Sequence, residues 1–239
     1  MIKFIDTLLQ RGYLEDNPKK GILLGRPAKI RMTKLAIDTI KATYRPNYEQ
    51  GGLLLMQPSD KPGFWLIDQV LIVPNRATVS TAYTPDPAVF NAAINSALNS
   101  GLLPLTFHTH PTNIGHSIYD HKKQNFYVKS SKPDRAAAQA GTKVIDNKLL
   151  LLPEAIAVLD TRFDTGFKIS FFEGGILPPS YAALTTTQIA ASVVAAASLL
   201  FFGKPLLFGL GAVFVAEEAR RPIYTNLSDG SLIVDFMLP

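Results

Sequence analysis

The stretch of sequence that decides the fold runs from residue 105 to residue 111 and reads LTFHTHP. An apolar run that carries His108 and His110 is typical of a buried strand with two polar side chains on one face, because side chains alternate between faces along a strand. Pro111 then ends the strand. We therefore expect two imidazoles to point the same way at the end of a buried strand.

Helices and strands are expected on both sides of this stretch. The predicted helices cover residues 2–14, 33–44 and 87–101, and in the last of these the apolar residues recur at i, i+3, i+4, i+7 and i+8. Short apolar runs predict strands at 29–32, 51–56, 64–73, 155–159 and 167–172, with a strand-like tail at 231–237. This order favours an α/β or α+β domain.

The composition narrows the classes of function. The chain has 239 residues, of which 47% are hydrophobic, and this is ample for a packed core. The formal net charge is +5 with Lys and Arg spread along the chain, so nucleic-acid binding is not expected. Zero cysteines exclude disulfides and thiolate metal sites, so any zinc must use His, Asp, Glu or water as ligands. The first residues lack the apolar core and cleavage site of a secretory signal, so we expect a cytoplasmic catalytic part.

All four histidines lie within 14 residues, from His108 to His121. Downstream, Ser117 is expected to be a helix N-cap, which would place Asp120 at the third helical position with its carboxylate facing the preceding loop. Two imidazoles and one carboxylate form the open three-ligand site of a catalytic zinc, whose fourth position holds a water of pKa about 7. We therefore predict that His108, His110 and Asp120 bind Zn2+.

Such a water also needs a general base, for which Glu49 is the candidate. It stands at the head of the apolar run 51–56, whose glycines allow another backbone or a substrate to approach closely. Each feature also has an ordinary explanation: solvated strand histidines, a simple capping box at 117–120, and a loop carboxylate after Pro46. A single metal site accounts for all of them together.

These residues resemble the JAMM metalloprotease family, also called JAB or MPN+. The family pattern is an upstream Glu, then His-Ser/Thr-His-Pro, then Ser-x-x-Asp. The matching stretches read EQGGLLL at 49–55, HTHP at 108–111 and SIYD at 117–120, and the helix before the histidine strand is similar too. The resemblance covers roughly residues 27–175. It leaves an N-terminal helical extension at 1–26 and a C-terminal region at 176–239.

The resemblance implies a JAB/MPN-like, cytidine-deaminase-like mixed β-sheet flanked by helices. It implies zinc ligation by His108, His110 and Asp120, proton transfer by Glu49, and support of the tetrahedral oxyanion by Ser117. Family members typically cut isopeptide or peptide bonds at the C-terminus of ubiquitin or ubiquitin-like proteins. The implied activity is a deubiquitinase-like, zinc-dependent isopeptidase or peptidase that acts on the tail of a ubiquitin-like protein or sulfur carrier.

The spacing departs from the family pattern at one place. Six residues separate His110 from Ser117, where the family usually has seven, and this could move Asp120 relative to the histidines. His116 and His121 could then substitute as ligands. We instead expect these two to be solvated loop and helix residues, because a three-ligand site is already complete.

Residues 189–216 form an apolar segment with one charge, Lys204. A single helix of this length would be about 42 Å long, which exceeds a bilayer core of roughly 30 Å. However, Lys204 and Pro205 at its middle disfavour a span. We expect an apolar helical hairpin that packs on the catalytic domain or a partner subunit, with contact to a membrane as the alternative.

Two other functions stay open at this point. One is a catalytically silent MPN-type scaffold that assembles a complex through its C-terminal apolar segment, although the intact Glu49, His108, His110 and Asp120 argue against it. The other is a zinc hydrolase that acts on a different bond, such as a phosphodiester.

Overall fold

In the computed structural model, most of the described residues lie in the first two thirds of the chain. The residues it describes are 2–18, 21–25, 27–61, 63–78, 82–111, 117–120, 125–128, 143–145, 148–150, 152–159, 166–173 and 223–236. The hairpin expected at 189–216 therefore lies outside the described residues. Within the described ranges, no helix is long and apolar enough to cross a membrane.

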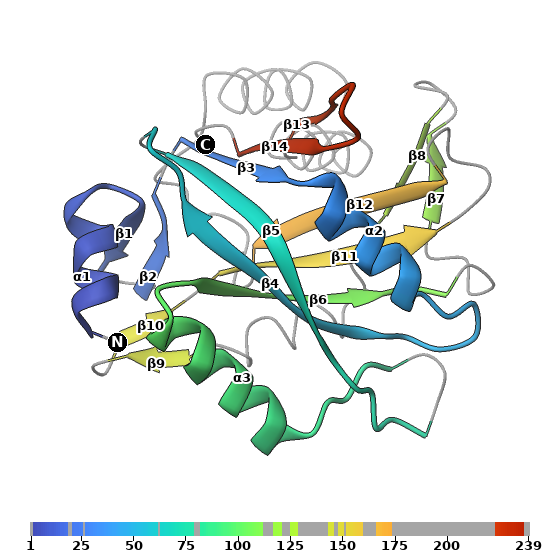
Figure 1. The fold of residues 1–239 in the computed structure, drawn as a ribbon, viewed down its shortest axis with the longest axis horizontal. Coiled ribbons are helices and arrows are strands. Elements are labelled where there is room, and N and C mark those ends of the chain that lie inside the picture. Colours follow the sequence, from blue (N-terminus) through green and yellow to red (C-terminus); the bar gives the residue numbers. More distant parts are fainter. Residues whose placement is uncertain are drawn as a thin grey trace, which may run out of the picture.

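A mixed eight-stranded sheet forms the body of the molecule (Figure 1). In spatial order its strands are β12 (Phe167–Glu173), β11 (Pro153–Leu159), β6 (Leu103–Thr109), β4 (Gly51–Pro58), β5 (Phe64–Val73), β3 (Ala28–Met32), β14 (Leu232–Phe236) and β13 (Ile223–Asn226). The pairs β6–β11 and β3–β5 are parallel, and the other neighbours are antiparallel. The predicted mixed α+β class is confirmed.

The two edges of this sheet curl toward each other. Phe171 on β12 donates a backbone hydrogen bond of 2.9 Å to the hydroxyl of Tyr224 on β13, although the two strands are at opposite ends of the strand order. The rings of Phe171 and Phe236 on β14 also lie 6.0 Å apart, edge to face. The main core contains one set of alternating side chains from every strand of this sheet except the exposed edge strand β13, for example Leu54, Leu105 and Phe107.

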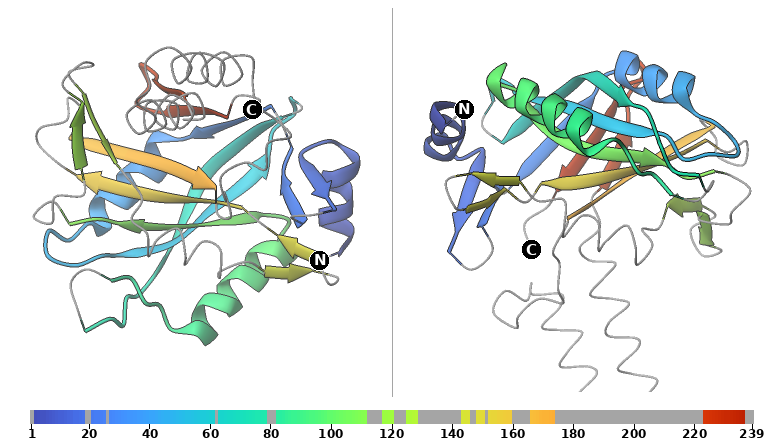
Figure 2. Two further views of the ribbon diagram at one scale, coloured as in Figure 1. Left: turned by 180° about the vertical axis from the view of Figure 1, so that it is seen from behind. Right: turned by 90° about the horizontal axis from the view of Figure 1, so that it is seen from below.

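Helices α2 (Lys34–Thr43) and α3 (Pro87–Asn99) lie on the same side of the molecule, as the right-hand view in Figure 2 shows. The hydroxyl of Thr33 caps α2 by accepting a hydrogen bond of 3.2 Å from the N–H of Ala36. The carboxylate of Asp86 caps α3, and Gly101 with a φ of 74° follows its end. Both helices confirm the sequence-based prediction.

The N-terminal residues form a helix, α1 (Ile2–Gln10), and a hairpin of β1 (Leu14–Asn17) and β2 (Gly21–Leu24). Gly12, with a φ of 72°, turns the chain between them. Ile5 and Leu8 of α1 are buried in the main core. The hairpin continues into a second sheet with β10 (Lys148–Leu150) and β9 (Lys143–Ile145), two strands that the sequence analysis did not predict.

The prediction of a helix starting at Ser117 is wrong. Residues 117–120 form strand β7 (Ser117–Asp120), which pairs antiparallel with β8 (Asn125–Val128). The backbone register pairs Ile118 with Tyr127 and Tyr119 with Phe126, and β-branched and aromatic residue types favour a strand. A four-residue capping signal is too short to compete with that pairing.

The cap on α3 predicts a pH dependence of stability. Hydrogen bonds from the backbone of Val89 and then Ala88, with the charge of Arg76, hold the pKa of Asp86 below its usual value. A carboxylate of this kind stabilises the fold above its unfolded-state pKa of roughly 3.9, and the contribution is lost as the pH falls through the folded-state pKa. Asp86→Asn keeps a capping oxygen but does not titrate. Its melting temperature, followed by circular dichroism, should lie below that of the native protein at pH 7, and this gap should shrink below about pH 4. A gap that stays constant with pH would contradict the assignment.

Candidate metal centre

Strand β6 carries His108, leads directly into His110, and lies between two hydrogen-bonded neighbours. His108 is paired with Gly51 on β4 and with Ile156 on β11. One residue past the strand, the N–H of His110 donates a hydrogen bond of 2.9 Å to the carbonyl of Ala157. Pairing on both sides leaves only the two faces of the sheet for side chains, so both imidazoles project from one face.

The two imidazoles meet at their Nε2 atoms. These atoms are 3.0 Å apart, and the ring planes are tilted by 51°. The residues are 8% and 1% exposed, respectively. Two nitrogens on one tetrahedral zinc, each at roughly 2.0–2.1 Å, lie about 3.3 Å from each other, so the pair fits a shared ion. The same distance suits a direct hydrogen bond when only one Nε2 carries a proton.

Glu49 comes just before the point where β4 pairs with β6. Beyond the Gly51–His108 pair, the N–H of Thr109 donates to the carbonyl of Gln50 at 2.7 Å, and the N–H of Gln50 donates to the Thr109 hydroxyl at 3.0 Å. The same register, extended by one residue on each segment, predicts Glu49 across from His110. Glu49 is only 5% exposed, so a carboxylate is buried two residues before the glycine that pairs with His108.

The structure places the other predicted site residues by their backbone alone. Ser117 and Asp120 are the first and last residues of β7, and their side chains are outside the described part, as are His116 and His121 altogether. Among the side chains that are described, no group of three or more His, Cys, Asp or Glu has a metal-binding arrangement. Asp120 as the third ligand stays a prediction.

A tyrosine that the sequence analysis missed covers the site from one side. The ring of Tyr83 lies parallel to that of His108, with an interplanar angle of 7° and centroids 6.5 Å apart. Its hydroxyl donates a hydrogen bond of 2.9 Å to the carbonyl of Val73, and burial raises the pKa of Tyr83, so the hydroxyl stays protonated at neutral pH. No local pattern marks this residue, because it lies in a loop 25 positions before His108 in the sequence.

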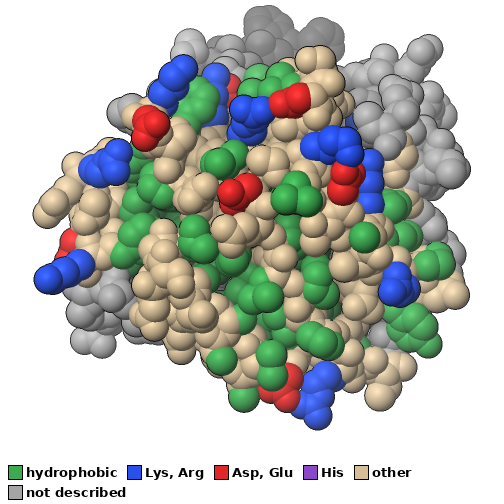
Figure 3. All heavy atoms as spheres, in the orientation of Figure 1, with side chains coloured by type: hydrophobic (Ala, Val, Ile, Leu, Met, Phe, Trp, Pro, Cys, Tyr) green, Lys and Arg blue, Asp and Glu red, His purple; other side chains and the backbone are tan. Residues whose placement is uncertain are grey.

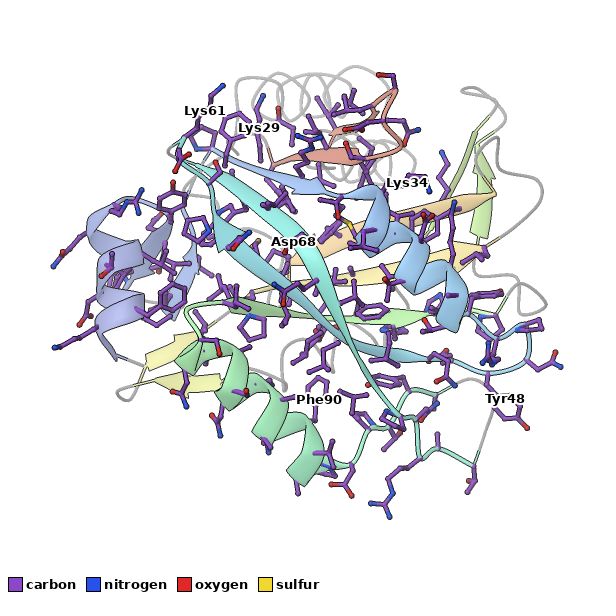
Figure 4. The ribbon with its side chains drawn as sticks, viewed as in Figure 1. Lys29, Lys34, Tyr48, Lys61, Asp68 and Phe90 are labelled. Atoms are coloured by element: carbon purple, nitrogen blue, oxygen red, sulfur yellow. The ribbon has the colours of Figure 1, made fainter. Side chains whose placement is uncertain are left out.

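Two further tyrosines lie near the same end of β6. The hydroxyl of Tyr44, just after α2, donates a hydrogen bond of 3.3 Å to the carbonyl of His110. Tyr48 is 52% exposed and lies in the loop beside the C-terminal end of β6 (Figure 4). Among the described side chains, no histidine reaches the face drawn in Figure 3, where hydrophobic side chains gather over β5 between α2 and α3. The two imidazoles are enclosed, with 8% and 1% exposure, while residues 45–48 before Glu49 are exposed to solvent.

Comparisons with known proteins add little to this description. No family model matches the sequence, and a search of curated proteins finds no match. Among solved structures, the solution structure of protein DSY2949 from Desulfitobacterium hafniense is similar, with 16% sequence identity and a TM-score of 0.40. The likeness covers 60% of this chain and 83% of that chain. A likeness of this strength carries no argument about fold or function.

The hydrogen bond between Thr109 and Gln50 provides a test of how the site is held. Thr109→Val keeps the shape of a fully buried side chain but removes the acceptor of the Gln50 N–H. We expect the free energy of unfolding, measured with urea, to fall by about 1–3 kcal/mol. The matched change Thr106→Val, at a half-buried position on the same strand, should alter it by no more than about 0.5 kcal/mol. Equal losses in the two variants would contradict this role for Thr109.

Proposed function

We propose that the chain is a JAMM-type zinc metallopeptidase that cleaves amide bonds at the C-terminal tail of a ubiquitin-like protein. The observation that carries the proposal is the meeting of the His108 and His110 Nε2 atoms at 3.0 Å, and the burial of Glu49, two residues before the partner of His108, supports it. A buried imidazole pair needs a partner for its polar atoms, and a shared cation supplies one. In this proposal Asp120 completes the ligand set from β7.

The residues divide the chemistry between them. A bound zinc would polarise the substrate carbonyl and lower the pKa of a water to about 7. Glu49 would accept a proton from the attacking water and deliver it to the leaving nitrogen as the C–N bond breaks, which yields a carboxylic acid and a free amine. Ser117 would donate a hydrogen bond to the oxyanion of the tetrahedral intermediate.

The proposal also includes the fold family, the C-terminal apolar segment and the cellular location. We propose that the curled sheet is of the JAB/MPN, cytidine-deaminase-like kind, and its mixed strand order, with helices α2 and α3 packed on it, supports this. Residues 189–216 would form the apolar hairpin that contacts the domain, a partner subunit or a membrane. The proposed location of the catalytic part is the cytoplasm.

The role of Glu49 can be tested with purified protein. Bound zinc would be measured first, and native and Glu49→Gln protein would then be compared on ubiquitin-like fusions. We expect the variant to keep its zinc and to lose cleavage by about 10²–10⁴-fold, which is the usual contribution of a general base. Glu15→Gln, at an exposed position on β1, is the matched control and should cleave at the native rate.

Two outcomes of that experiment would replace the proposal. Native protein that binds no zinc would favour the catalytically silent scaffold. Glu49-dependent cleavage of nucleic acid without proteolysis would favour a hydrolase of a different bond. The nucleic-acid assay uses single- and double-stranded DNA and RNA under the same conditions as the assay of protein cleavage.

The third ligand can be identified by zinc titration of two variants. Asp120→Ala should weaken zinc binding by more than the roughly 10–100-fold that removal of an outer hydrogen-bond partner usually causes. His116→Ala should bind zinc with near-native affinity. Zinc loss in the His116 variant alone would show that the shorter loop before β7 has exchanged one ligand for another.

A further inference from the structure

One asparagine joins the start of β4 to the segment that covers the site. The side-chain Nδ2 of Asn75 donates hydrogen bonds to the carbonyl oxygens of Glu49, at 2.8 Å, and Ala82, at 2.7 Å. Its Oδ1 accepts from the N–H groups of Ala77 and Thr84, both at 2.9 Å. An amide has two N–H donors and one oxygen with two lone pairs, so Asn75 uses its full capacity here. These bonds draw Ala82 and Thr84 toward the backbone of Glu49.

Tyr83 lies between those two tethered residues and is held at its far end as well. Its hydroxyl donates to the carbonyl of Val73, so the ring is fixed from both ends. The ring occupies the space that a side chain at Gly51 would need, since a Cβ there would lie 2.8 Å from a Tyr83 ring atom. Gly51 is paired with His108, so the tyrosine fills the empty side-chain position directly across from that imidazole.

The Tyr83 ring, which lies parallel to the His108 ring, restricts how the His108 ring can rotate. A histidine side chain has a broad second torsion angle, so its ring rotates easily unless neighbours restrict it. A second ring lying parallel, within the separation of 4.5–7 Å that is usual for aromatic pairs, favours one orientation over the others. In this orientation the Nε2 of His108 faces the Nε2 of His110.

We infer that Tyr83 is a positioning residue that keeps the His108 imidazole turned toward His110, and that Asn75 holds Tyr83 and Glu49 in register with that imidazole. The base and the first ligand are then aligned by one side chain that touches neither the metal nor the substrate. The inference rests on the proposed metal site, and its test therefore has one arm with zinc and one without.

The arm with metal compares Tyr83→Leu, Tyr83→Phe and native protein by zinc competition titration and by the visible spectrum of the cobalt-substituted protein. The Leu variant should bind zinc about tenfold or more weakly, the usual effect of losing a residue that orients a ligand, and its cobalt spectrum should shift. The Phe variant keeps the ring and should stay within about threefold of native affinity. Tyr224→Leu on β13 removes a ring and the hydroxyl that accepts a hydrogen bond from the N–H of Phe171, so it serves as the control and should bind zinc as native protein does.

The role of Asn75 is tested by Asn75→Asp. The new carboxylate can still accept hydrogen bonds from the N–H groups of Ala77 and Thr84, but at neutral pH it cannot donate to the carbonyls of Glu49 or Ala82. This substitution should displace Glu49, the proposed general base, more than it changes substrate contacts. We therefore expect kcat to fall about tenfold or more, with KM within about twofold of native. Asn91→Asp, an exposed position on α3, makes the same chemical change and should leave both constants unchanged. A fall in kcat matched by an equal rise in KM would overturn the role assigned to Asn75.

The arm without metal uses NMR of the His108 ring protons in zinc-free protein. The nearby ring should displace these resonances, and the displacement should persist in Tyr83→Phe and vanish in Tyr83→Leu. Unchanged His108 resonances and unchanged zinc affinity in a folded Leu variant would overturn the inference while leaving the proposed function intact. If native protein binds no zinc, the proposed function fails and the NMR result alone decides whether Tyr83 orients His108.

Discussion

The pairing of β6 with β4 on one side and β11 on the other is the constraint on which the site depends. A strand held from both sides cannot slip by one residue without turning every side chain to the opposite face. His108 and His110 therefore share a face, and their Nε2 atoms meet at 3.0 Å. Burying two imidazoles is unfavourable unless their polar atoms find partners. The approach of the two Nε2 atoms suits a hydrogen bond from one to the other or a shared cation.

The glycines at the start of β4 let the neighbouring segments come close enough to build this site. A Cβ at Gly52 would lie 1.9 Å from the carbonyl oxygen of Leu71, and a Cβ at Gly51 would lie 2.4 Å from that of Phe107. No side chain fits at either position. The ring of Tyr83 fills the space beside Gly51. The absence of a side chain at Gly51 is therefore what allows the Tyr83 ring to pack there.

The functional residues come from segments that are distant in the sequence. Glu49 precedes β4, Asn75 and Tyr83 follow β5, and the histidines end β6. Antiparallel pairing of β4 with both β5 and β6 brings the start of β4 to the end of the other two strands. Three loops therefore converge at one end of the sheet, where the pairing of the strands fixes their positions.

Local signals determined most of the regular elements from the sequence alone. Helical spacing was enough for α2, which ends before Pro46, and for α3, which ends before Gly101, and continuous apolar runs were enough for β4 and β5, because these patterns act within a few residues. The pair of histidines on one face also followed from strand alternation. Local reasoning failed at Ser117, where a capping signal was outweighed by pairing with β8. Only the tertiary structure decided which strands are neighbours, that Gly51 pairs with His108, and that the Tyr83 ring lies parallel to the His108 ring. The reason is physical: these relations depend on hydrogen bonds between strands and on packing across the sheet, and neither leaves a periodic trace in the sequence.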